Sequence, residues 1–84
     1  MKEINDEEHH LFRCAAAALD EAKRVRAKWS AFHSYHEGYA VILEELDELW
    51  DECKKKEPDK QKLAEEAIQV AAMALRFIAE LTTK

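Results

Sequence analysis

A chain of 84 residues is the size of one small domain, and this one combines 48% hydrophobic and 37% charged residues with a single glycine and a single proline. That balance excludes a disordered chain and favours long helices joined by few turns. The net charge of −5 disfavours non-specific nucleic-acid binding, and no apolar run is long enough to span a membrane.

The first predicted helix starts after Asn5 and runs to about Lys28. Asn5 can cap its N-terminus, and Glu8 completes a capping-box pattern three residues later. Cys14 lies within this helix, 39 positions before Cys53, so the two cysteines are predicted to be reduced, buried thiols of a cytoplasmic protein. Apolar residues recur in this helix at spacings of three and four and predict one apolar face. It consists of Phe12, Ala15, Leu19, Ala22 and Val25.

The second predicted helix begins at Ser34, where Ser34 and Glu37 repeat the capping-box pattern, and it runs to about Lys56. The turn that follows contains Pro58. The apolar residues of this helix again recur at spacings of three and four, and they predict a core stripe of Tyr39, Ile42, Leu46, Leu49 and Cys53.

The third predicted helix runs from about Asp59 to Leu81. Between positions 67 and 75 only Gln69 is polar, and a helix that is apolar all round must be covered on most sides. We therefore predict an all-α, three-helix chain that forms a four-helix-bundle core by dimerising or tetramerising through its second and third helices. The predicted core stripe of the third helix is Leu63, Ala67, Val70, Ala74, Phe77, Ile78 and Leu81.

Residues 44–52 hold six carboxylates beside this apolar sequence. Glu45 and Glu48 lie three positions apart and face the same way on a helix, and Glu66 and Gln69 repeat that spacing on the next helix. If the two helices pack antiparallel, both pairs meet in a pocket whose carboxylates suit Mg²⁺. The alternative, a solvated acidic face, is the more common meaning of such a row.

Three further residues are candidates for substrate binding. His36 lies near the acidic row and could touch a phosphate, or it could be a surface or capping histidine. Trp29 follows a basic segment that could clamp a phosphate while the ring stacks on a base, although basic residues there also complement the helix dipole. Lys54 has the same two interpretations.

Residues 36–50 resemble the first motif of the MazG-like, all-α nucleoside triphosphate pyrophosphatases. That motif is Glu-Glu-x-x-Glu on one helix, followed on the next helix by Glu-x-x-Asp. Glu44, Glu45 and Glu48 match the first part, and Glu66 matches the glutamate of the second. The resemblance is strongest over residues 29–81, within one MazG-like helical domain that spans residues 1–84.

The resemblance implies a helical homo-oligomer that binds Mg²⁺, or Mn²⁺ in its place, and hydrolyses (d)NTPs to the monophosphate and pyrophosphate. Glu45, Glu48 and Glu66 would be the metal ligands, with Glu44 as a further one and with Glu45 and Glu48 as the catalytic pair. Gln69 stands where the family has its final Asp, and an amide brings oxygen but no charge. The alternative is therefore a non-catalytic helical oligomerisation module that keeps the bundle and has lost catalysis.

Overall fold

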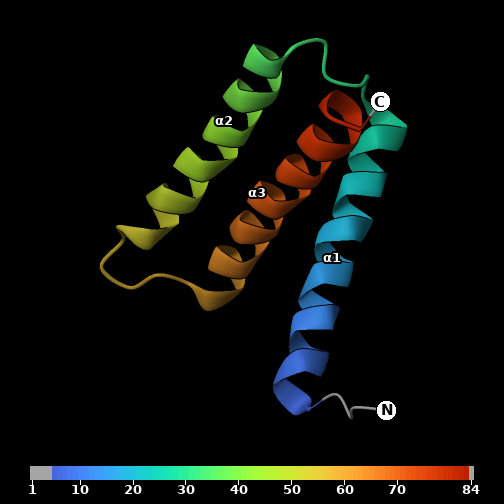
Figure 1. The fold of residues 1–84 in the computed structure, drawn as a ribbon. Coiled ribbons are helices and arrows are strands. Elements are labelled where there is room, and N and C mark those ends of the chain that lie inside the picture. Colours follow the sequence, from blue (N-terminus) through green and yellow to red (C-terminus); the bar gives the residue numbers. More distant parts are fainter. Residues whose placement is uncertain (1–4, 84) are drawn as a thin grey trace.

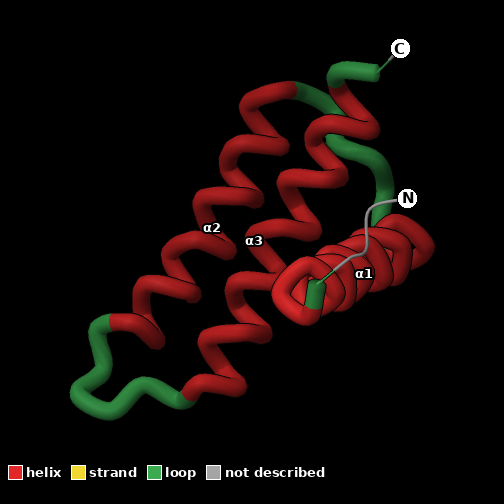
Figure 2. Tube along the Cα trace, turned by 60° about the horizontal axis from the view of Figure 1, so that its bottom comes forward, coloured by secondary structure: helices red, strands yellow, loops and turns green. Residues whose placement is uncertain are grey.

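The computed structural model describes residues 5–83, which form three helices and no strand: α1 (Asp6–Lys28), α2 (Tyr35–Cys53) and α3 (Lys60–Leu81). α3 lies between the other two, packing antiparallel to α2 and crossing α1 at a wide angle (Figures 1 and 2). Within the described residues, no Cα atom of α1 lies within 8 Å of a Cα atom of α2. The predicted all-α chain of three helices is confirmed.

Side chains cap the N-termini of all three helices: the sequence predicts the caps of α1 and α2, and the structure adds one at α3. The Asn5 side chain accepts a hydrogen bond from the Glu8 backbone N–H at 2.8 Å, and Ser34 accepts one from Glu37 at 3.0 Å. Asp59 caps α3 by accepting from the backbone N–H of Gln61 at 2.9 Å. Each cap satisfies a donor that the first turn of a helix leaves without a partner.

The end of α2 differs from the prediction, because the helix stops at Cys53 instead of continuing to about Lys56. The buried Glu52 side chain accepts hydrogen bonds from the Lys55 ammonium at 2.8 Å and from the Asp59 backbone N–H at 3.0 Å. The bond from Asp59, followed by the bond from Lys55, lowers the pKa of the Glu52 carboxyl. These bonds favour a turn directly after Cys53 over further helix.

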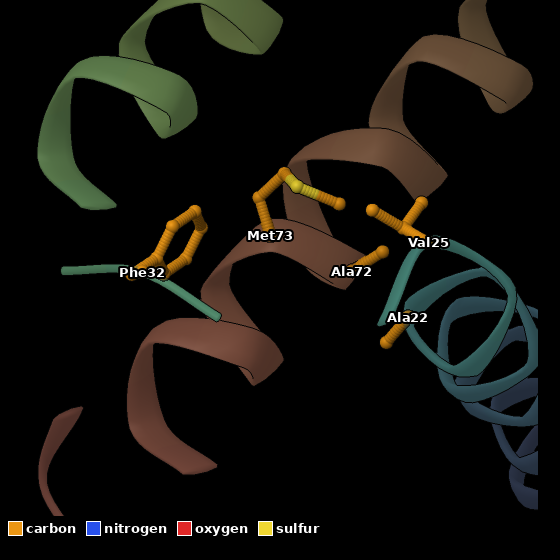
Figure 3. Close-up of a cluster of buried hydrophobic side chains, with 5 residues drawn as sticks. All are labelled: Ala22, Val25, Phe32, Ala72 and Met73. Carbon is orange, nitrogen blue, oxygen red and sulfur yellow. The ribbon is translucent and has the colours of Figure 1, made fainter. Parts of the chain in front are cut away.

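The buried core lies where α3 meets α1 and the segment that follows α1. Figure 3 shows it as a single cluster, and Val41, Ile42, Phe77 and Leu81 pack against it while remaining partly exposed. Gly38 allows α2 to approach α3 closely, since a Cβ at that position would lie 2.6 Å from a ring carbon of Phe77. The cluster consists of Ala22, Val25, Phe32, Ala72 and Met73.

Much of the predicted core is exposed in the single chain. α3 covers only one side of each neighbouring helix, so several large residues of the predicted core stripes are exposed in the single chain. The predicted burial of Cys14 and Cys53 is wrong, since both are free and exposed. Despite this apolar surface, none of the described helices is both long and apolar enough to cross a membrane. The stripe residues that are exposed include Phe12, Leu19, Tyr39, Leu46 and Ile78.

Candidate metal centre

Three carboxylates converge where α2 and α3 lie side by side. Glu45 and Glu48 come from α2 and Glu66 comes from α3, and one oxygen of each lies within 4.8 Å of the others. The i, i+3 spacing places the first two on one side of α2, and the antiparallel packing of α3 brings Glu66 to them. The structure thus assembles the three acids that the sequence analysis proposed as metal ligands.

The surroundings of this cluster strongly change the pKa of Glu45. Burial, together with the nearby charges of Glu48, Glu66 and Glu44, raises the pKa of the Glu45 carboxyl from its ordinary 4.5 to about 7. Lys62 approaches Glu66 to 3.6 Å, while Glu48 is exposed. The donors are all carboxylate oxygens, which Mg²⁺ and Mn²⁺ prefer, so this set fits a hard divalent cation.

Gln69 lies one helical turn beyond Glu66, and its side chain is directed to α1. Its amide nitrogen donates a hydrogen bond to the Glu21 carboxylate at 2.6 Å. Arg24 donates two further bonds to Glu21, at 2.8 and 2.6 Å. Chiefly because of the bond from Arg24, and although burial opposes it, the pKa of Glu21 is lowered to about 2. The Gln69 nitrogen is therefore committed to α1, which leaves the carbonyl oxygen as the atom that a metal could use.

A cavity of about 650 Å³ opens beside the carboxylates, within the size range of small-molecule sites. Glu45 belongs both to the three-carboxylate cluster and to the cavity wall, whereas Glu48 and Glu66 do not line the cavity. Apolar, aromatic and charged side chains share the lining, which suits a ligand with both a flat ring and anionic groups. The lining includes Arg24, Trp29, Phe32, Glu44, Glu45 and Gln69.

The three predicted substrate-binding residues lie at different places in the structure. Trp29 lines the same cavity as Glu45. His36 lies on a second, smaller hollow together with Tyr35, and Lys54 pairs with Asp51 at 3.0 Å. Trp29 alone among the three lines the cavity beside the carboxylates.

Sequence reasoning missed Arg76 and Glu80, which hold the segment between α1 and α2 against α3. Arg76 donates to Glu80 at 2.8 Å and to the Ser30 carbonyl at 3.0 Å, and its guanidinium lies 4.2 Å above the Phe32 ring. Glu80 accepts the Phe32 backbone N–H at 2.8 Å. Burial opposes ionisation of Glu80, but the bonds from Arg76 and Phe32 lower its pKa overall. The signal in the sequence is an Arg/Glu pair at i, i+4 within an otherwise apolar helix end.

Comparisons of the chain with protein-family models, with curated proteins and with solved structures found no match. A functional proposal for this chain therefore depends on the geometry of Glu45, Glu48 and Glu66 and on the motif in which they lie.

Proposed function

We propose that the chain binds Mg²⁺, or Mn²⁺ in its place, and hydrolyses nucleoside triphosphates to the monophosphate and pyrophosphate. The observation that carries the proposal is the approach of Glu45, Glu48 and Glu66 to within 4.8 Å of one another. The resemblance to the MazG-like pyrophosphatases supplies the reaction and the class of substrate.

Each carboxylate has a distinct position from which to hold a cation. Glu45 reaches the centre from the cavity wall, Glu48 from the exposed side of α2, and Glu66 from α3. A bound divalent metal would offset the charge of the triphosphate and polarise the attacking water. Binding it would also offset the repulsion among these carboxylates, which adds to the effect of burial in raising the pKa of Glu45.

The cavity offers separate contacts for the two ends of a nucleotide. The exposed Trp29 ring lies on its wall and can stack against a nucleobase. Arg24 contributes a guanidinium to the same lining, and the part of it that is not bonded to Glu21 can meet a phosphate. Both contacts lie in the cavity whose wall includes Glu45.

The test is pyrophosphate release from a panel of NTPs and dNTPs with Mg²⁺. Glu45→Gln keeps the side-chain shape but removes the charge, so we expect turnover to fall by about 10²–10³-fold. Asp47→Asn is the matched control, because Asp47 is an exposed acid of the same helix outside the three-carboxylate cluster. Unchanged turnover in Glu45→Gln, or no release from any nucleotide by the folded wild type, would contradict the proposal.

A second candidate is a non-catalytic helical module, and the Gln69–Glu21 hydrogen bond favours it. Where the motif has an acidic ligand, this chain has an amide that joins α3 to α1. The two candidates differ in their response to Mg²⁺. A melting temperature that rises with Mg²⁺ but no turnover would indicate a module that retains the metal, and no response of either kind would indicate a solvated acidic face.

A further inference from the structure

His10 and Cys14 lie four positions apart in the first half of α1, and their side chains meet on its surface. The Cys14 Sγ lies 3.9 Å from the His10 Nε2, and both residues are exposed. Side chains at i and i+4 lie on one face of a helix, so the spacing itself brings the two groups together. Neither belongs to the cluster around Glu45, because α1 contributes none of its carboxylates. The pair therefore joins a nitrogen and a sulfur ligand at a second place on the chain.

The distance between these two atoms is close to the one that a single metal ion requires. Zn²⁺ binds imidazole nitrogen at about 2.0–2.1 Å and thiolate sulfur at about 2.3 Å, so in tetrahedral geometry the two donors lie about 3.6 Å apart. The 3.9 Å between Sγ and Nε2 exceeds this by only about 0.3 Å. Because both side chains are exposed, a small rotation can supply the difference, and an ion can enter without moving another part of the chain.

The donors and their surroundings select a class of ion. A neutral imidazole and a thiolate suit zinc and similar transition metals, whereas Mg²⁺ prefers oxygen. The acidic first turn of α1, with Asp6, Glu7 and Glu8, lies about one turn before the pair and adds negative charge that attracts a cation. No third His, Cys, Asp or Glu donor of the described residues lies within 4.8 Å of both atoms, so water would complete the shell. A site with two protein ligands exchanges its metal, unlike the closed four-ligand sites of structural zinc.

The first half of α1 depends on its own helical hydrogen bonds, because little packs against it. Positions 5–16 are exposed apart from the partly buried Glu8, and the first buried residue is Ala18. In Figure 1 this blue end of α1 lies apart from α2 and α3. Helical turns without tertiary packing are only marginally stable in water. An ion bound to both His10 and Cys14 would close one of these turns and stabilise it by linkage.

We infer that His10 Nε2 and Cys14 Sγ chelate one zinc ion, or a divalent cation of similar softness, on the first half of α1. The thiol proton passes to solvent as the bond between Sγ and the metal forms. The imidazole binds through the Nε2 lone pair and keeps its own proton on Nδ1. Without metal, the pair makes a weak hydrogen bond that is open to water. The site is independent of the proposed function, because it uses other residues and other donor atoms.

The first test is titration of the reduced protein with Co²⁺ in the presence of excess Mg²⁺. Co²⁺ replaces zinc at such sites and gives a near-ultraviolet charge-transfer band when a thiolate binds it, so ions held by carboxylates do not contribute. We expect the band in wild type, its loss on addition of zinc, and its absence in Cys14→Ser. Cys53→Ser is the matched control, since Cys53 is also exposed but has no histidine within four positions on either side.

Two histidine variants test the second ligand. His10→Ala should weaken Co²⁺ binding by about 10²–10⁴-fold, because the advantage of two linked donors is lost. His9→Ala is its control, since His9 is exposed and adjacent but lies on a different side of the helix from Cys14. A band that is missing in wild type, or that remains in Cys14→Ser, would overturn the inference. Equal Co²⁺ affinity in His10→Ala and wild type would do so as well.

Hydrogen exchange provides a second test, which reports on the helix itself. At about ten times its Kd, zinc should slow amide exchange over residues 10–14 about tenfold in wild type, since each opening of this turn must first release the ion. The same amides should not respond to zinc in Cys14→Ser. Equal slowing in both proteins would place the zinc elsewhere, and no slowing in wild type would show that the pair does not clamp the turn. Either result contradicts the inference and leaves the carboxylate cluster untested by it.

Discussion

Gln69 on α3 donates its side-chain amide to the Glu21 carboxylate on α1, over 2.6 Å. This bond links the helix that carries Glu66 to the one helix that contributes none of the three clustered carboxylates. Arg24 holds Glu21 ionised, with a pKa of about 2, so the Glu21 carboxylate can only accept hydrogen bonds. A side chain of α3 that bonds to it must therefore be a donor. An amide supplies one and a carboxylate does not. The amide at position 69 therefore has a structural role that an Asp there would lack.

Gln69→Asp should destabilise the metal-free chain. The substitution removes the donor and places a second negative charge beside Glu21, so we expect a loss of about 1–3 kcal/mol at neutral pH, measured by urea unfolding. The double variant Glu21→Gln/Gln69→Asp restores a donor–acceptor pair in the opposite sense and should recover most of that loss. Full stability of Gln69→Asp on its own would show that the bond to Glu21 contributes nothing.

The same substitution tests whether position 69 belongs to the metal shell. If Mg²⁺ is held near Gln69, a carboxylate there adds charge, and calorimetric titration should show tighter Mg²⁺ binding in Gln69→Asp than in wild type. Gln69→Glu is a useful comparison, because it adds the same charge on a longer side chain. Unchanged affinity in both would place position 69 outside the shell.

Glu48→Gln should abolish the stabilisation that Mg²⁺ gives to the folded chain. Metal at a hundred times its Kd stabilises a folded state by about 2.7 kcal/mol, which raises the Tm of a domain this small by roughly 10 °C or more. Glu48 is exposed, so its loss should leave helicity intact. Glu65→Gln is the control, since Glu65 is an exposed acid next to Glu66 and outside the cluster. A wild-type Mg²⁺ response in Glu48→Gln would remove Glu48 from the site.

The stability of the metal-free chain should depend on pH through Glu45. Its pKa is raised from 4.5 to about 7 on folding, so the folded state binds the extra proton between these values. This contribution of Glu45 to the free energy of unfolding is at most about 3 kcal/mol. It is fully present below pH 4.5 and is lost as the pH rises through about 7. The measurement is the difference in urea-unfolding free energy between wild type and Glu45→Gln from pH 4.5 to 8. A difference that stays constant across this range would contradict the raised pKa.

The helix starts and the meeting of the three carboxylates could be predicted because both depend on local sequence. Asn5 and Ser34 cap helices through bonds that span three residues. Glu45 and Glu48 share a side of α2 because of helical spacing alone, and the short turn at Pro58 forces α3 back toward them. These relationships need no knowledge of how distant segments pack.

The partners of Gln69 and the extent of the buried core could not be predicted in this way. Periodicity identifies the apolar side of α1, but it does not fix the angle at which α1 crosses α3 or the side chain that Gln69 will meet. The end of α2 depended on the side chain of Glu52, which bonds to Asp59 seven residues away. The partner of Gln69 and the end of α2 are therefore set by specific side-chain contacts, which override the local apolar pattern.

Arg76→Met should be among the most destabilising single substitutions in this chain. It would leave the Glu80 carboxylate without its buried, hydrogen-bonded guanidinium, and breaking a buried ion pair in this way costs about 3–5 kcal/mol. Arg26→Met is the matched control, because exposed Arg26 approaches the same carboxylate only to 3.4 Å and should contribute less than about 1 kcal/mol. Adding Glu80→Gln to Arg76→Met removes the unpaired charge while keeping an acceptor for the Phe32 N–H, so the double variant should regain stability in urea unfolding.

Because Arg76 and Glu80 hold the segment that carries Trp29 and Phe32 against α3, the single variant Arg76→Met should also expose Trp29 further to quenchers, whereas Arg26→Met should not. Equal losses of unfolding free energy in Arg76→Met and Arg26→Met would mean that the buried Arg76–Glu80 pair stabilises the chain no more than the exposed contact of Arg26.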